Sequence, residues 1–348
     1  MKSSPRFTTN LTLLVLVLLF AAAPAVLAQD PANTSFKSDV EKAWKERIKR
    51  LSAYSSGSGT RAWQEKALMP DSQEEPAYMV ASFEWKYKFP LLLAEGSVQG
   101  VEIPAAHIVE GCNQMYSFEL EKRTESDEWA IQNVEPVLKK AKRPDLWEEL
   151  LKNPPGNDLH SVFLRNHILS EFILPDNRTS VVSLIMSPLC VVESFETLEN
   201  GNVRMRFTIA GFEEKDKNSQ DAPAEFNFPA GSVDFTPNDW RVSAATLAHG
   251  SWEQSMVCEY KTDGDIPILV SKKVKRTLSI GAVTEDVLTF DLSNEKLDPA
   301  QVALSYYGLP EPEFVSETNR IRLVLIALGA LMIGFAVWRF SRRRSAEQ

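Results

Sequence analysis

Strict alternation of apolar and polar residues marks several segments of the chain. From Ala81 to Phe89 every second side chain is apolar, and the side chains between them are polar: Ser82, Glu84, Lys86 and Lys88. Because successive side chains point to opposite faces of a strand, this pattern predicts a half-buried antiparallel strand. The same period recurs at Tyr116, Phe118 and Leu120, from Val203 to Ile209, and from Leu288 to Leu292.

Shorter segments rich in strand-forming residues are expected to extend this sheet. They lie around residues 129–134, 179–186, 225–235, 241–248, 255–261, 267–275 and 301–306. Clusters such as Pro237-Asn238-Asp239 and Thr262-Asp263-Gly264-Asp265 mark turns between them. The second cluster is better explained as a hairpin turn than as a calcium loop, because the full set of oxygen ligands is missing.

A helical period precedes the first strand. Ser38 and Glu41 form a capping box, in which each side chain satisfies an unpaired backbone amide. Four large apolar residues then recur on one helical face: Val40, Trp44, Ile48 and Leu51. This predicts an amphipathic helix over about 38–52. We expect an extended segment from Gln29 to Phe36 before it, and a flexible Ser- and Gly-rich connector from Ser52 to Thr60 after it.

Together these patterns predict the α+β class, with a large curved antiparallel sheet and helices packed at one side. A short helix between Pro144 and Leu151, and a second around residues 159–167, separate the earlier strands from the later ones. One domain or two packed halves both fit. If the sheet packs fully around its helices, the apolar residues are core. If it stays open as an unclosed barrel, some of them line a concave cavity.

The first 28 residues have the order of a secretory signal peptide. Lys2 and Arg6 precede an apolar run from Leu11 to Ala23, and small residues lead to Ala28. Such leaders are removed on export, so we expect cleavage between Ala28 and Gln29.

The opposite end predicts a membrane span. Residues 323–338 contain no charge and no proline, and a helix of this length crosses most of an apolar slab about 30 Å thick. An arginine cluster follows, which favours the cytoplasmic side: Arg339, Arg342, Arg343 and Arg344. The chain therefore divides into a signal peptide (1–28), an extracytoplasmic domain (29–308), a Pro-rich polar stalk (309–322), a transmembrane helix (323–338) and a basic cytoplasmic tail (339–348). The sequence therefore predicts a single-pass membrane protein with its N-terminal domain in the periplasm or at the cell surface.

The negative net charge of the chain argues against nucleic acids as partners. The chain holds 38 basic and 47 acidic residues. Removing both predicted ends takes away seven of the basic residues and one of the acidic ones, which leaves a formal charge of −15 on the remainder. Nucleic-acid binding depends on cationic surface, so we expect no nucleic-acid partner.

Three cysteines, Cys112, Cys190 and Cys258, lie far apart without metal-ligand spacing. In an oxidising compartment one pair could form a disulfide and leave a third thiol. The alternative, which we favour slightly, is that all three are small buried residues, because a free cysteine packs like an apolar side chain.

The sequence offers no convincing catalytic motif, and we expect neither a cofactor nor a metal. Ser293 and Lys296 match S-x-x-K, but so short a match arises often by chance. His160 and His167 lie two helical turns apart, about 10 Å, which is too far for a shared metal without a third element. Acidic pairs are frequent, and a hydrolase would need two of their carboxyls to face each other across a cleft.

Several segments together resemble the lipoprotein-carrier (LolA-like) superfamily of bacterial exported proteins. They are the basic leading helix from Lys42 to Arg50, the strand from Ala81 to Tyr87, and two late segments, residues 235–242 and 263–270. The resemblance covers roughly residues 38–308 and implies an unclosed β-barrel that holds an acyl chain, with a lipid or a lipoprotein as ligand. Carriers of that superfamily are soluble or lipid-anchored, so the predicted transmembrane tail departs from its pattern.

The tail has a resemblance of its own. Pro310, Glu311 and Pro312, followed by a hydrophobic helix and an arginine cluster, resemble a C-terminal sorting signal of the Pro-Glu-Pro type. In that family the motif abuts the helix, whereas here polar residues up to Arg322 intervene. The alternative is a stalk stiffened by proline.

The leading hypothesis is a membrane-tethered extracytoplasmic binding module for a lipid or lipidated protein of the cell envelope. The first alternative is a structural or protein-interaction component of the envelope, without a ligand cavity, that meets a protein partner through an exposed surface or edge strand. A hydrolase of unknown substrate is the third.

Overall fold

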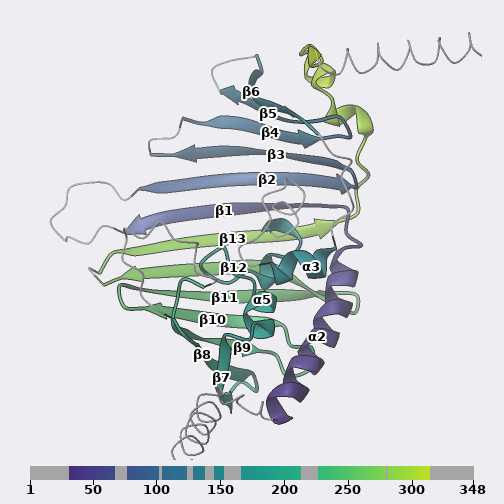
Figure 1. Cartoon of the computed structure of the whole chain (residues 1–348). Helices are drawn as coiled ribbons and strands as arrows, with labels where there is room; N and C mark the ends of the chain where they lie inside the picture. The colour runs from purple at the N-terminus through teal and green to yellow at the C-terminus, as the bar shows by residue number, and fades with distance from the viewer. Residues whose placement is uncertain are drawn as a thin grey trace, which may run out of the picture.

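A single antiparallel sheet organises the protein. The computed structural model describes residues 31–66, 77–101, 104–123, 128–137, 145–152, 166–212, 226–279 and 281–313. Within them lies a 13-stranded sheet in the order β6-β5-β4-β3-β2-β1-β13-β12-β11-β10-β9-β8-β7 (Figure 1). β6 and β7 each have one neighbour in this order, so the described sheet is open. The predicted α+β class and the large, unclosed antiparallel sheet are confirmed.

The strands follow the chain in two runs. The first run is β1 (Ser56–Lys66), β2 (Tyr78–Lys88), β3 (Leu91–Gly100), β4 (Ala106–Cys112), β5 (Tyr116–Arg123) and β6 (Ala130–Pro136). The second is β7 (Cys190–Thr197), β8 (Val203–Ile209), β9 (Ala230–Phe235), β10 (Val242–His249), β11 (Trp252–Asp263), β12 (Ile266–Leu278) and β13 (Val283–Ser293). β1 pairs with β13, and this contact joins the two runs into one sheet.

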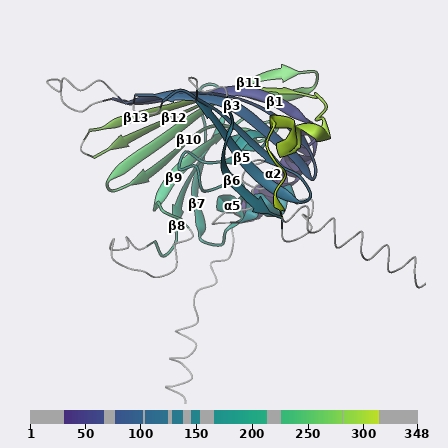
Figure 2. The same cartoon turned by 90° about the horizontal axis from the view of Figure 1, so that it is seen from above.

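Four of the described helical elements lie on the concave side of the sheet, which we call the inner face (Figures 1 and 2). They are α2 (Pro31–Leu51), α3 (Leu146–Leu151), the 3₁₀ turn η1 (Ser170–Phe172) and α5 (Val181–Met186). We call these four elements the helical cover. Figure 1 shows α2, α3 and α5 across the half of the sheet that runs from β13 to β7, whereas β1 to β6 extend beyond these three helices.

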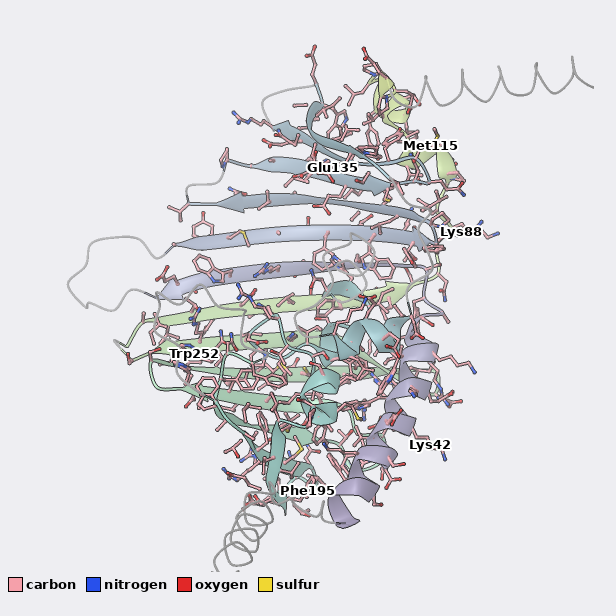
Figure 3. The ribbon with its side chains drawn as sticks, viewed as in Figure 1. Lys42, Lys88, Met115, Glu135, Phe195 and Trp252 are labelled. Carbon is pink, nitrogen blue, oxygen red and sulfur yellow. The ribbon has the colours of Figure 1, made fainter. Side chains whose placement is uncertain are left out.

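The helical cover builds the larger hydrophobic core. The predicted stripe of α2 is confirmed, because Val40, Trp44, Ile48 and Leu51 are all buried. They pack with the inner-face side chains of the second run of strands, such as Phe207 and Leu247. Lys42 lies on the opposite, exposed side of α2 (Figure 3). The amphipathic pattern of α2 therefore determines which face of the helix meets the sheet.

A second, smaller core lies on the outer face. Leu92 of β3 belongs to the larger core and its neighbour Leu93 to the smaller one, so β3 buries a side chain on each face. The residues that cover the outer face come from the end of the described chain, residues 297–309, which include η2 (Pro299–Val302) and η3 (Leu304–Tyr307). We call this segment the outer cover. Beneath it lie Val109, Tyr116, Phe118 and Leu120.

Three sequence predictions are wrong. Residues 179–186 were expected to form a strand, but Ser180 caps a helix there, its hydroxyl accepting from the Ser183 amide, and α5 results. Residues 301–306 form 3₁₀ turns, because Asp298 caps the Ala300 amide. The expected extended segment before the first helix is helical from Pro31, where Phe36 packs against Phe195 and Trp240.

The expected flexible connector from Ser52 to Thr60 is also wrong, since β1 occupies most of it at the centre of the sheet. The reason lies in the neighbouring strand. A Cβ at Gly57 would stand 2.7 Å from the Trp85 ring, and one at Gly59 would stand 2.6 Å from the Phe83 ring. The two glycines therefore let aromatic rings of β2 lie directly over β1.

All three cysteines are buried, and none of them forms a disulfide with another described residue. Burial raises the pKa of the Cys112 and Cys190 thiols to about 11 and that of Cys258 to about 12. The favoured interpretation, three small buried residues, matches this arrangement, in which the thiols stay protonated at neutral pH.

The predicted signal peptide with its Ala28–Gln29 cleavage site, the transmembrane helix and the arginine cluster at 339–344 lie outside the described residues. Among the helices that the structure does describe, none is long and apolar enough to span a membrane.

Candidate functional site

The inner face of β13, β1, β2, β3 and β4 forms the floor of a groove. One cross-strand row consists of Leu288, Arg61, Ala81 and Val98, which are direct partners along the sheet. The next row on the same face consists of Phe290, Gly59, Phe83, Gly96 and Ile108. Most of these residues line a cavity of about 530 Å³. Clefts of about 300–1,000 Å³ are typical of small-molecule sites.

A short segment of chain roofs the groove. Asn166, His167, Ser170, Ile173 and Asn177 line the cavity opposite the strands. The His167 ring lies 4.9 Å from the Phe83 ring, edge to face. The backbone of Ile173 bridges to Ser180, which closes the roof into a compact loop.

Two buried cations hold this roof in place. Arg47 of α2 makes a bidentate ion pair with Glu171 of η1, in which Nη2 lies 2.6 Å from Oε2, and Nη2 also donates to the Pro267 carbonyl at 2.8 Å. Lys272 of β12 donates from Nζ to the Ile173 carbonyl at 2.8 Å and to the Ser170 carbonyl at 3.3 Å. Because a buried charge is costly unless it is paired or hydrogen-bonded, these contacts fix the roof relative to the sheet.

The groove is charged at both of its ends. Arg61 makes a bidentate contact with Asp286, and its Nη2 lies 2.7 Å from Oδ2. Lys272 lies close to this pair, and burial lowers its pKa. At the β4 end, burial and then the neighbouring Glu119 raise the pKa of Glu110.

The central part of the groove is uncharged. Burial lowers the pKa of His167 to about 4, so its imidazole is neutral at physiological pH. Between Arg61 and Glu110 the floor is formed by small or apolar residues: Ala81, Phe83, Gly96, Val98 and Ile108. An apolar middle with polar ends suits an amphiphilic ligand better than a uniformly polar one.

The outer face of the same strands has the opposite character. A hollow of about 540 Å³ there is floored by hydroxyl side chains, among them Ser58, Thr60, Ser82, Ser97 and Thr289. The hydroxyls bond to one another, with 2.8 Å between Thr60 and Thr289 and 2.8 Å between Ser82 and Ser97. The polar residues of the alternating pattern therefore lie outside, and the apolar ones line the groove.

Where the described chain includes the candidates from sequence, they do not join into one site. Glu311 of the possible sorting motif accepts a hydrogen bond from the Tyr116 hydroxyl and from the Ser305 amide at 3.0 Å, so the motif lies against the outer cover. Ser293 is paired with the Ser56 hydroxyl at 2.7 Å. Among the described residues, no group of three or more His, Cys, Asp and Glu side chains could hold a metal ion.

Sequence reasoning missed the charged residues of the groove. The sequence held one indication that Lys272 is buried, because it shares a strand face with Val274 two residues later, which is also buried. A lysine on the apolar side of an alternating strand is rarely buried without a partner. Arg61 carried no such signal, since it lies just after the predicted connector, which ended at Thr60, and before the first predicted strand, which began at Ala81.

A scan against protein-family models finds no match for the chain, and a sequence search of curated proteins finds none either. Among solved structures, the chain is similar to a domain from Vibrio parahaemolyticus described as an outer membrane lipoprotein-sorting protein, with a TM-score of 0.37 and 11% identity over 78% of this chain and 98% of that one. It is also similar to a LolA superfamily protein from Nitrosomonas europaea, with a TM-score of 0.33 and 8% identity over 77% of this chain and 99% of that one.

These comparisons name the superfamily that the sequence segments resemble. At TM-scores below 0.5 they add nothing to the assignment of a function, which rests on the groove itself.

Proposed function

We propose that the protein is an extracytoplasmic binding module, without catalytic activity, that holds an elongated lipid-like ligand in the inner groove. The observation that carries the proposal is the groove of about 530 Å³. Its floor is apolar between the charged ends, and its roof is fixed by a buried ion pair and buried hydrogen bonds. In this proposal the predicted signal peptide exports the chain and the predicted C-terminal helix tethers it to a membrane.

The shape of the groove supports a chain-like ligand. Its lining runs from Lys272 on β12 to Glu110 on β4, which is five strand spacings, or about 24 Å measured along the sheet. Ala81, Val98 and Ile108 line it between these ends. Gly96 adds no side chain to the floor beside the Phe83 ring, so an extended apolar chain can lie across the inner face of the strands.

The test uses two adjacent residues of β2 that point to opposite faces. Ala81 lies on the groove floor, whereas Val80 is on the outer face and 49% exposed. The Ala81→Trp substitution fills the groove, and Val80→Trp adds the same ring outside it. We expect the uncharged dye N-phenyl-1-naphthylamine to bind the full chain, kept soluble in a non-ionic amphipol, with rising fluorescence. Ala81→Trp should abolish this signal and Val80→Trp should retain it.

Equal dye binding by both variants would place the apolar site elsewhere and overturn the proposal. Circular dichroism of both variants controls for loss of fold, because a misfolded chain also loses the site.

A second candidate is protein interaction through the edge strand β7. In the described sheet β7 has one neighbour, and two of its apolar side chains are exposed, Val191 at 38% and Phe195 at 43% (Figure 3). An exposed edge strand can pair with an extended segment of another protein. Substituting Val191→Lys would remove such an interaction, measured by cross-linking in cells, and would leave dye binding intact.

A further inference from the structure

Lys272 is the most deeply buried charge of the groove. Its side chain is 2% exposed, and its ammonium group is held only by two carbonyl oxygens, those of Ser170 and Ile173. Among the described residues, no carboxylate lies within ion-pair distance of Nζ. The ammonium group has three donors, so one remains for a further partner.

Asp176 and Asp286 lie near enough to act electrostatically on Lys272, but among the described residues neither makes an ion pair with it. Arg61 and Asp286 neutralise each other, because the guanidinium meets both carboxylate oxygens. This contact uses Nε and Nη2 of Arg61 and leaves Nη1 without a partner among the described residues. The Arg61 side chain is 41% exposed, so it is accessible from the groove. The end of the groove at Lys272 therefore presents two cationic side chains, each with a donor that no described residue uses.

The opposite end carries acidic groups. Glu110 lines the groove on β4, and its partner across the strand pair is Glu119 on β5. Between the two ends the only titratable lining residue of the roof, among the residues described, is His167, which is neutral at physiological pH. The groove is therefore asymmetric in charge along its length.

We propose that the groove takes a single-chain amphiphile with an anionic headgroup, a carboxylate or a phosphate, which binds at Lys272 and Arg61. The apolar tail then extends over Ala81, Val98 and Ile108 toward β4. This inference rests on the proposed function and adds to it the ligand's headgroup and its direction in the groove.

The physical reason is the cost of a buried cation that has no ion-pair partner among the described residues. Burying an ammonium group is unfavourable unless an anion or several acceptors satisfy it. An anionic headgroup would supply the missing charge through a charge-assisted hydrogen bond, which is stronger than a neutral one. A headgroup at the other end would meet Glu110 and Glu119 and be repelled.

The experiment measures displacement of N-phenyl-1-naphthylamine from the full chain in a non-ionic amphipol. Three competitors have the same C16 tail: palmitate, hexadecyl phosphate and the uncharged hexadecanol. We expect both anions to displace the dye at concentrations about 10- to 100-fold lower than hexadecanol, the range expected for hydrogen bonds to a charged group. The ratio of the two anions then tells whether a carboxylate or a phosphate is preferred.

Variants assign the preference to Lys272. Lys272→Met removes the charge and keeps the length of the side chain, so the anions should lose their advantage over hexadecanol. Because Lys272 also holds the roof, the result is the ratio of the displacing concentrations of anion and hexadecanol within each variant. The matched control is Lys273→Met, because Lys273 is the next residue, points outward and pairs with Glu259 on the surface. Lys272→Arg keeps the charge and should retain part of the preference even if Lys272→Met fails to fold.

The possible outcomes test the proposed lipid site, the anionic headgroup and the assignment to Lys272 separately. If the dye and all three competitors fail to bind, the proposed function is wrong. If hexadecanol binds as tightly as palmitate and hexadecyl phosphate in the unaltered chain, the groove is a lipid site and the anionic headgroup is wrong. If Lys273→Met changes the preference as much as Lys272→Met does, the effect is one of overall charge and the assignment to Lys272 fails.

Discussion

The two halves of the sheet bury opposite faces. From β13 to β7 the inner face is packed against the helical cover, and it contributes most of the larger core. From β3 to β6 the outer face is packed against the outer cover. Where the outer cover supplies the core, the inner face of the same strands is available for a groove. An open sheet can therefore hold a ligand without losing its core, because the packing partner changes sides along the sheet.

The seam between the halves explains where the groove lies. β1, β2 and β13 are at the centre of the strand order, between the region packed by helices and the region packed by the outer cover. Trp85 of β2 and Leu92 of the neighbouring β3 lie in the larger core. Phe83, two residues before Trp85, lies on the groove floor. The change from core to groove thus occurs within a single strand.

The largest expected loss of stability comes from a substitution in the helical cover. Trp44 is fully buried, packs against Phe172 at 5.6 Å and donates from Nε1 to the Trp240 carbonyl at 2.7 Å. Trp44→Ala should lower the free energy of unfolding by about 3–5 kcal/mol. Phe83→Ala in the groove should cost at most about 2 kcal/mol, because that ring is partly exposed already. Denaturant unfolding of the full chain measures both, and equal losses would contradict the difference between the halves.

An acid-dependent effect of intermediate size should arise at the seam. The folded protein holds His167 neutral, with its pKa lowered from 6.5 to about 4 by burial. Between these two pKa values the unfolded chain therefore binds a proton at His167, and the folded chain does not. The stability from neutral His167 is fully present above pH 6.5 and is lost as the pH falls to about 4. The loss amounts to about 3 kcal/mol.

The measurement that checks this is the free energy of unfolding against pH for the unaltered chain and for His167→Phe. The difference between the two curves isolates the imidazole from the other groups that titrate in acid. This difference in unfolding free energy should change with pH between pH 6.5 and about 4. Parallel curves across this window would show that His167 is not buried in a neutral form.

The smallest effect concerns the outer cover. The Tyr116 hydroxyl donates to Glu311 and accepts from the Leu304 amide at 3.0 Å. Burial raises the pKa of Tyr116 to about 12, so the hydroxyl stays protonated and able to donate. Tyr116→Phe should cost about 1–2 kcal/mol, because the buried Leu304 amide loses its acceptor. Hydrogen exchange at Leu304 should accelerate in this variant.

The control for this change is Tyr306→Phe in the same segment. Tyr306 is 56% exposed, so its hydroxyl should contribute less than about 0.5 kcal/mol. Faster exchange at Leu304 in both variants would mean that the outer cover is held by something other than the Tyr116 contacts.

The elements that were predictable from the sequence are those whose pattern is local. The stripe of α2 and the alternation of β2, β5, β8 and β13 depend on residues close in sequence, and each was identified. α5 was mistaken for a strand, because its β-branched residues obscured the cap at Ser180. β1 was mistaken for a connector, because its glycines are explained only by Phe83 and Trp85 of the partner strand.

The chemistry of the groove could not be derived in the same way, because its pairs are distant in sequence. Arg47 meets Glu171 across 124 residues, and Arg61 meets Asp286 across 225. No local pattern specifies such pairs. The sequence did leave open whether the apolar strand residues form a core or line a cavity, and the structure shows that both occur, in different halves of the sheet.

The most direct test of the account is the mass of the full chain purified from bacterial membranes in a non-ionic amphipol and measured by native mass spectrometry. The account predicts that the unaltered chain and Val80→Trp carry a bound lipid at near one copy per chain, and that Ala81→Trp carries none. An unaltered chain without bound lipid, or an Ala81→Trp variant that retains the same lipid mass, would contradict the groove as the site of binding.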